Sequence, residues 1–333
     1  MSKSKNILEI RNVTKKFNTP NNKVLTACDN ISLEFEEGKI LAIVGESGCG
    51  KSTLMKMIVQ LENVTSGEIL YEGEDITKGS KLINLGEKLS YIHIGIIASM
   101  GYEKVKVLRK TKVALISTGD EVICGGIPLT EGKIYDSNRR MIAARLEELG
   151  CDVVLAQVMG DDENLIANEI KNIMNDVDVV FTTGGVSVGK KDIMHQVIQI
   201  LHAKRIFWRV NMKPGTPAIY AVYENKPLLC LSGNPFAAIA TFELMGKQLL
   251  YKLGQDPGLR EVRKEAILQD EFLKESRGRR LIRAIYDEGR VYLPKGGHSS
   301  GILGSMVGCN CLIDIKPGTP KLDKGEKVEV VLL

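Results

Sequence analysis

An alternation of apolar runs with amphipathic helical patterns between residues 112 and 203 constrains the fold of this chain most strongly. Periodicities of 2 and 3.6 residues predict strands and helices in the order 113–116, 137–149, 153–158, 162–174, 177–182 and 192–203. Strands that alternate with helices form parallel sheets covered by helices on both faces. We therefore predict an α/β domain with a parallel sheet.

Polar loops follow the predicted strands at the edge where ligands bind in such sheets. They span 117–121, 160–162 and 182–189, and 212–217 and 231–235 come later. Gly184, Gly185, Gly189 and Ser187 suit an anionic ligand, while the acidic residues with Lys213 suit a Mg²⁺-assisted phosphate reaction. The structural alternative is that the acids are helix caps and the glycines are turns. Because five such loops lie on one edge of the sheet, we favour a ligand-binding site over a purely structural role.

In the C-terminal part, short runs of alternating apolar and polar residues follow one another without helical patterns between them. Short strands are predicted at 281–286, 291–293, 312–315 and 328–332, with a turn at 287–289. A small all-β domain fits this pattern. We interpret His298 as an exposed loop residue rather than a catalyst.

The N-terminal residues carry a phosphate-binding pattern. Strands are predicted at 7–13 and 31–35, and a buried strand at 40–44 leads into Gly45-Glu46-Ser47-Gly48-Cys49-Gly50-Lys51-Ser52-Thr53 and a helical pattern. Gly45, Gly48 and Gly50 would let backbone N–H groups converge on phosphate. Lys51 would then contact the terminal phosphates, Ser52 would bind Mg²⁺, and Thr53 belongs to the same phosphate-binding set.

With Phe17 and Ser66-Gly67-Glu68-Ile69, this region resembles the start of an ABC-transporter ATPase subunit over about residues 7–76. The resemblance implies possible ATP binding, with Phe17 stacked on adenine. We find no glutamine loop, signature sequence, Walker B carboxylate or switch histidine further on, so machinery for hydrolysis is missing.

Residues from about 86 to 333 resemble molybdopterin molybdenumtransferase, the MoeA and gephyrin E-domain family. The resemblance rests on His93-Ile94-Gly95, Ala98-Ser99-Met100-Gly101, Ser117-Thr118-Gly119-Asp120-Glu121, Ile134-Tyr135-Asp136-Ser137-Asn138, Gly184-Gly185-Val186-Ser187-Val188-Gly189, Met212-Lys213-Pro214-Gly215 and Gly233-Asn234-Pro235. It implies a three-layer α/β/α molybdopterin-binding domain of the MoaB/Mog-like kind. It also implies a homodimer that takes adenylylated molybdopterin and molybdate, and releases AMP with Mg²⁺.

Several residues of this chain stand at positions that match functional positions of the family. The resemblance implies catalytic roles for Glu121, Asp161, Asp192, Lys213 and Arg209, with Asp161 and Asp192 as metal ligands. It implies cofactor binding by Thr118, Gly119, Asp120, Gly184, Gly185, Ser187, Gly189, Pro214, Gly215, Gly233, Asn234 and Pro235. Arg209 replaces a lysine of some members, and Ser232 replaces the usual proline. The N-terminal segments that complete the family's dimer and partner site are replaced by the ATPase-like fragment.

The composition argues against several other classes of protein. The 45 Lys and Arg residues against 41 Asp and Glu residues leave a small net charge, which argues against a nucleic-acid partner. No apolar run approaches the length of a membrane span. Seven cysteines, without a metal-ligand spacing, and the lack of a secretory signal favour the cytoplasm.

A chain of 333 residues implies two or three domains. We predict a partial ATP-binding fragment at 1–79, a molybdopterin-binding α/β domain at 80–255 and a β domain at 256–333. Three functions stay open: a transferase of molybdenum cofactor synthesis, an ABC-type nucleotide-binding transport subunit, and a non-catalytic fusion that only binds the cofactor.

Overall fold

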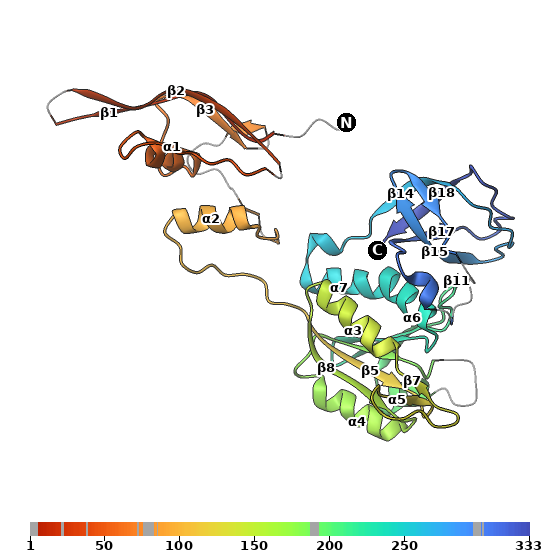
Figure 1. The fold of residues 1–333 in the computed structure, drawn as a ribbon. Coiled ribbons are helices and arrows are strands. Elements are labelled where there is room, and N and C mark those ends of the chain that lie inside the picture. The colour runs from red at the N-terminus through yellow and green to blue at the C-terminus, as the bar shows by residue number, and fades with distance from the viewer. Residues whose placement is uncertain are drawn as a thin grey trace. The chain divides into compact units, whose positions relative to one another are not determined.

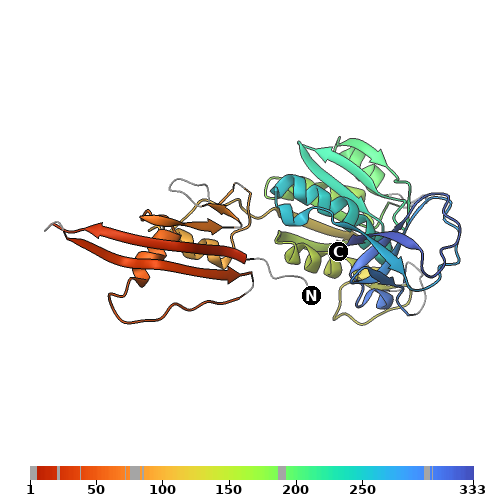
Figure 2. The ribbon, with the colours of Figure 1, turned by 90° about the horizontal axis from the view of Figure 1, so that it is seen from above.

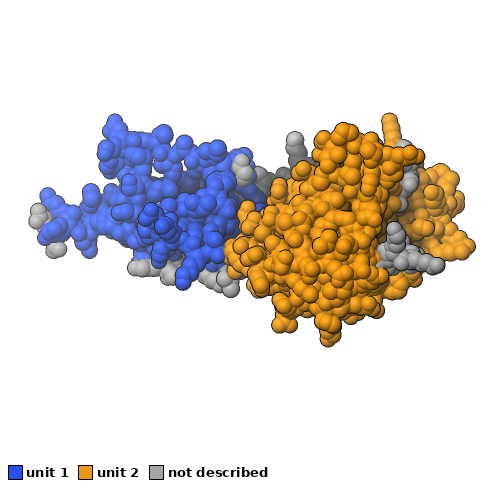
Figure 3. All heavy atoms as spheres, turned by 90° about the horizontal axis from the view of Figure 1, so that it is seen from below, with its two compact units in different colours: residues 1–107 blue, residues 108–333 orange. Residues whose placement is uncertain are grey.

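The computed structural model describes residues 6–20, 23–37, 39–71, 73–75, 83–84, 86–186, 193–295, 301 and 303–333. The chain divides into two compact units, residues 1–107 and 108–333 (Figure 3). Gly79, near which a domain boundary is predicted, lies outside the described residues. Every helix of the described ranges is too short or too polar to cross a membrane.

Unit 1 is built on a long antiparallel pair of strands, β1 (Asn6–Asn18) and β2 (Val24–Glu36), which lie side by side in Figures 1 and 2. The sheet continues from β1 to β3 (Ser66–Tyr71) and β4 (Glu74–Asp75). Helix α1 (Lys51–Ile58) buries Leu54 and Met57 against this sheet, and α2 (Tyr91–Ser99) follows. The predicted strands at 7–13 and 31–35 and the helix after the glycine-rich loop are confirmed.

The predicted buried strand at 40–44 is wrong. These residues form no strand, and the side chains of Ile40 and Val44 are 95% and 86% exposed. An apolar run becomes a buried central strand only when neighbouring strands pair with both of its edges. In the described part of unit 1, the sheet order β2-β1-β3-β4 provides no such place.

Unit 2 contains a sheet in the order β10-β12-β13-β9-β5-β8. Its strands are β5 (Lys112–Thr118), β8 (Asp152–Met159), β9 (Val179–Thr183), β10 (Lys204–Trp208), β12 (Ile219–Tyr223) and β13 (Lys226–Leu231). The predicted strands of the parallel sheet, β5, β8 and β9, are parallel to one another, and β13 pairs with β9 in parallel. Strand β12, which was not predicted, runs antiparallel to both β10 and β13. Glu224 and Asn225, with φ of 49° and 61°, form the two-residue turn that joins β12 to β13. Two positive φ angles are the geometry of a tight hairpin, which forces antiparallel pairing.

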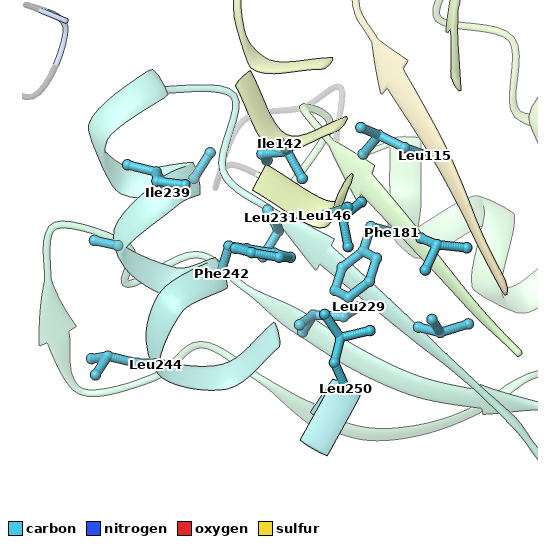
Figure 4. Close-up of a cluster of buried hydrophobic side chains, with 14 of the residues drawn as sticks. Leu115, Ile142, Leu146, Phe181, Leu229, Leu231, Ile239, Phe242, Leu244 and Leu250 are labelled. Atoms are coloured by element: carbon cyan, nitrogen blue, oxygen red, sulfur yellow. The ribbon is translucent and has the colours of Figure 1, made fainter. Parts of the chain in front are cut away.

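Helices cover both faces of this sheet, as the three-layer prediction requires. They are α3 (Asn138–Glu148), α4 (Glu163–Ile173), α5 (Ile193–Ile200), α6 (Pro235–Thr241), the π-helical turn η1 (Phe242–Gly246) and α7 (Lys247–Gly254). Successive residues of β5 point to opposite faces. Val113 and Leu115 pack with α3, α6 and α7, whereas Ala114 and Ile116 pack with α4 and α5 (Figure 4 shows the first cluster).

A small β domain ends the chain, as predicted. Its strands are β14 (Arg263–Leu268), β15 (Arg279–Asp287), β16 (Arg290–Tyr292), β17 (Cys311–Ile315) and β18 (Lys327–Leu332), with short 3₁₀ turns η2 (Pro257–Leu259) and η3 (Gly304–Met306). An additional β15–β17 pairing closes these strands into a barrel. The two-residue strand β11 (Met212–Lys213), which sequence patterns do not reveal, pairs with β15 and joins this barrel to the α/β part.

We expect Phe242→Ala to lower the free energy of unfolding of unit 2 by about 3–5 kcal/mol, the usual cost of deleting a buried aromatic ring. The Phe242 ring is fully buried and meets Phe181 edge-on, with ring centroids 5.4 Å apart. Urea unfolding followed by the fluorescence of Trp208, the single tryptophan, measures this loss. The control Leu129→Ala changes an exposed side chain, so a comparable loss there would contradict the expectation.

Candidate functional site

A cavity of about 490 Å³ lies at the edge of the sheet where β5, β9 and β13 end. Residues that follow these strands line it, and so does the segment that leads into α3. The lining residues are Ser117, Thr118, Gly119, Glu121, Val122, Ile134, Tyr135, Asp136, Ser137, Asn138, Asp161, Thr183, Gly184, Gly185, Val186, Pro217, Ser232, Gly233, Asn234 and Pro235. Parallel strands bring their carboxyl ends together, which places these loops at one cavity.

Gly184 allows β5 and β9 to end close together. Its φ is 97°, and a Cβ atom at this position would lie 2.3 Å from the carbonyl oxygen of Thr118. The Gly184 N–H donates to the carbonyl of Leu231 over 3.1 Å, and the Thr118 hydroxyl donates to the carbonyl of Thr183 over 3.3 Å. Only glycine satisfies both the backbone angle and this approach.

A chain of polar contacts fixes the segment before α3. The Arg139 guanidinium donates to Asp136 over 2.7 Å, with the two side chains 9% and 1% exposed. The Ser117 hydroxyl donates to the same carboxylate over 3.2 Å, and the Ile134 N–H donates to the carbonyl of Glu121 over 2.8 Å. These contacts hold the 134–138 segment against the cavity.

Sequence reasoning gave no site role to Tyr135, Asp136 or Asn138, although it quoted them for the family resemblance. The Tyr135 hydroxyl donates to the carbonyl of Ile127 over 2.9 Å, which fixes its ring at the cavity wall. The signal that could have found these residues is a polar Asp-Ser-Asn string directly before an amphipathic helix.

Two predicted acidic residues, Glu121 and Asp161, line the cavity. Asp120 does not; its carboxylate accepts a hydrogen bond from the Asp161 backbone N–H over 2.9 Å and so shapes the loop. Asp162 accepts from the N–H groups of Asn164 and Leu165, which makes it the cap of α4, as the structural alternative predicted. Asp192 lies outside the described residues, together with Ser187, Gly189 and His298.

The predicted cationic residues lie away from the described cavity lining. Arg209, with φ of 69°, stacks its guanidinium on Trp208 at 4.4 Å from the ring centroid. Lys213 belongs to β11 and is exposed, and Pro214 follows it through a cis peptide bond. Gly215 has a φ of 98°, and a Cβ there would lie 2.3 Å from the Thr241 hydroxyl. From this stretch, Pro217 is the residue that reaches the cavity.

The carboxylates at the cavity are hard oxygen donors of the kind Mg²⁺ prefers. Glu121 and Asp161 provide two of them. Within the described ranges, no group of three or more acidic, histidine or cysteine side chains is close enough to hold a metal ion. The described ranges therefore assemble no complete metal site around these two carboxylates.

In unit 1, the glycine-rich loop at 45–50 closes around its own lysine. The Lys51 ammonium donates to the carbonyls of Gly45 and Glu46 over 2.7 and 2.6 Å and contacts the sulfur of Cys49 at 3.4 Å. Phe17 lies in β1, with the Lys15 ammonium 4.8 Å from its ring centroid. Because the strand expected before the loop is absent, the complete phosphate-binding unit is not formed.

Two family models match the C-terminal part of the chain. Residues 114–252 match one described as "Probable molybdopterin binding domain", and residues 265–333 match the MoeA C-terminal region (domain IV). By the first match, the α/β part of unit 2 falls in the class of domains that this model describes. Over its C-terminal part, the chain belongs to the MoeA family of molybdopterin molybdenumtransferases.

Individual relatives lead to the same family. The chain is 31% identical over 284 residues to a molybdopterin molybdenumtransferase of Staphylococcus aureus and 33% identical over 284 residues to one of Staphylococcus epidermidis. Both alignments cover 84% of this chain and 66% of the relative, so the chain spans just under two thirds of their length. A MoeA protein from Pyrococcus horikoshii has a similar structure, with a TM-score of 0.68 and 30% identity over 79% of this chain and 65% of that chain.

An alignment over 84% of the chain is longer than unit 2 and includes part of unit 1. The similarity to MoeA proteins therefore begins earlier than the predicted residue 86. The comparisons give the predicted ABC-type fragment no support, so the resemblance of residues 7–76 rests on the sequence strings alone.

We expect Gly184→Ala to destabilise unit 2 by about 1–3 kcal/mol more than Gly126→Ala. Both residues have positive φ, which costs an alanine about 1–2 kcal/mol, but a Cβ at Gly126 meets nothing within 4 Å. Urea unfolding followed by Trp208 fluorescence compares the two variants. Equal losses would contradict the close approach of Gly184 to Thr118.

Proposed function

We propose that this protein is a transferase of molybdenum cofactor biosynthesis, which inserts molybdate into adenylylated molybdopterin and releases AMP. The proposal is carried by one observation: the loops after β5, β8, β9 and β13 meet at a single polar cavity of about 490 Å³ in a MoeA-like fold. A cavity of this volume accommodates a small organic ligand. The similarity to named molybdopterin molybdenumtransferases supports the choice of substrate.

The residues at the cavity would have different roles in binding the substrate and in the reaction. Gly184 and Gly185, both with positive φ, shape the loop after β9 at the cavity wall, where the phosphate group of the substrate would lie. Glu121 and Asp161 would hold Mg²⁺ together with Asp192, and the ion when bound supplies charge for the departing phosphate. Lys213 and Arg209 would neutralise charge that develops on phosphate or molybdate oxygens. For Arg209 this requires the guanidinium to leave its stacked position on Trp208.

A homodimer is part of the proposal, because the family resemblance implies that two copies build the active assembly. Light scattering of the purified chain should therefore give the mass of two copies, and the mass of one copy would contradict this part of the proposal.

We expect Glu121→Gln and Asp161→Asn each to reduce AMP release from adenylylated molybdopterin, with molybdate and Mg²⁺ present, by at least about tenfold. Even partners in the outer shell of a metal site usually contribute 10–100-fold. The control Asp176→Asn removes an exposed carboxylate outside the cavity and should release AMP at the rate of the unaltered protein.

Binding of molybdopterin without AMP release by the unaltered protein would favour the cofactor-binding alternative. Loss of activity in the Asp176→Asn control would contradict the assignment of Glu121 and Asp161.

A second candidate function is nucleotide phosphate binding at residues 45–53, which would require the loop to release the Lys51 ammonium from the carbonyls that it now contacts. ATP would replace the Gly45 and Glu46 carbonyls as partners of this ammonium. We expect ATP to raise the melting temperature of the protein if it binds, because a ligand stabilises the state it binds. Lys51→Ala should abolish the shift and Lys56→Ala, on the exposed side of α1, should keep it. No shift in the unaltered protein would exclude this function.

A further inference from the structure

A serine, a histidine and a glutamate meet at the start of α2 in unit 1. The Ser90 hydroxyl lies 3.1 Å from Nδ1 of His93, and Nε2 of the same ring lies 3.4 Å from the Glu87 carboxylate. The imidazole is buried, whereas Ser90 is half-buried and Glu87 is exposed. None of the three is among the described residues that line the unit 2 cavity, and none belongs to the glycine-rich loop.

The contacts of the His93 ring fix where its proton lies. The Ser90 backbone N–H donates to Nδ1 over 3.0 Å, so Nδ1 carries no proton and the neutral ring holds its proton on Nε2, the atom that faces Glu87. The Glu87 carboxylate is held in turn by the backbone N–H and the side-chain amide of Asn84, over 2.8 and 3.3 Å. A basic nitrogen therefore faces a hydroxyl, and a carboxylate orients the other nitrogen, which is the arrangement that activates a serine as a nucleophile.

A helix cap explains part of this arrangement. The Ser90 hydroxyl accepts from the His93 N–H over 3.4 Å, and the His93 ring accepts from the Ser90 N–H, which together form a capping box for α2. Glutamate or glutamine is the usual residue at the position of His93 in such a box and would complete it equally well. The cap requires neither an imidazole nor a carboxylate at the far nitrogen of that residue. Glu87 is therefore a partner that the capping role leaves unexplained.

The position of Ser90 at the end of a helix provides two further parts of an acyl-transfer site. Tyr91 and Ile92 follow it directly, and the first N–H groups of a helix have no partner within the helix. Donors of this kind stabilise the negative oxygen that forms when a hydroxyl attacks an ester. Ile94, four residues after Ser90 on the same side of the helix, is 58% exposed and offers an apolar contact to an acyl group.

We propose that Ser90 is an acyl-accepting nucleophile with His93 as its general base, and that the site takes a short-chain carboxylic ester. The Ser90 oxygen forms a bond to the ester carbonyl carbon, and its proton moves to Nδ1 of His93. The alcohol leaves with the electron pair of the broken C–O bond and takes that proton. Water then cleaves the acyl-serine in the same way, which releases the carboxylic acid and restores the hydroxyl. Glu87 is a positioning residue, and this activity is separate from the proposed transferase.

The test uses the whole chain and two probes. p-Nitrophenyl acetate reports acyl transfer through the absorbance of released p-nitrophenolate, and a fluorophosphonate reports the nucleophile through mass spectrometry of the labelled peptides. We expect the fluorophosphonate to label Ser90. We also expect the unaltered protein to release p-nitrophenolate at least about 100-fold faster than Ser90→Asn, the usual contribution of a general base.

Variants separate this chemistry from the cap. Asparagine is a good N-cap residue and glutamine completes a capping box, so Ser90→Asn and His93→Gln keep α2 while removing the nucleophile or the base. Each should lose the activity with an unchanged far-UV circular dichroism spectrum. Glu87→Gln should lower the rate at least about tenfold, because an imidazole without its carboxylate is a poorer base, and Glu87→Asp should retain most of it. Ser66→Ala removes an exposed serine of the same unit and should change nothing.

Equal rates for the unaltered protein and Ser90→Asn would overturn the inference, and so would an unchanged rate in His93→Gln. Fluorophosphonate labelling confined to other residues would overturn it as well. This last measurement needs only the unaltered protein, so it decides the matter even where a variant fails to fold. AMP release from adenylylated molybdopterin does not depend on any of these outcomes.

Discussion

The burial of β5 and β9 on both faces is the constraint on which unit 2 depends. Residues 113–118 and 179–183 are almost completely shielded from water, with α3, α6 and α7 on one face and α4 and α5 on the other. Helices that cover both faces leave the ends of the strands as the place for polar chemistry. The cavity, its carboxylates and its amides all lie at this edge.

The cavity wall is held by contacts between segments far apart in the chain. Asn138 donates to Gly233, Ser117 donates to Asp136, and Gly184 passes within contact distance of Thr118. The buried Asp136–Arg139 pair adds rigidity, because removing either partner would leave an uncompensated charge in the interior. Such a wall keeps the shape of the cavity before a ligand enters, which lowers the cost of binding.

Much of unit 2 was predictable because its strands and helices follow regular patterns. The helix pattern at 137–149 became α3, and the apolar run at 113–116 became β5. The run at 40–44 has the apolar composition of a buried strand. It forms no strand, since no strand of the described unit 1 lies beside it to pair with it. The contact between the Asn138 amide and Gly233 was missed because the two residues are 95 positions apart and no local pattern links them.

The sequence by itself determined most of the strands and helices of unit 2, because these follow from side-chain periodicity. It also placed glycines where the backbone needs a positive φ, such as Gly184. It also contained the family strings from which the MoeA resemblance follows. Only the tertiary structure decided that the Asn138 and Asn234 oxygens are shielded from water with no partner among the described residues, and that Ile40 stays exposed. Burial depends on which distant segments pack together, and a local pattern of residues does not contain that information.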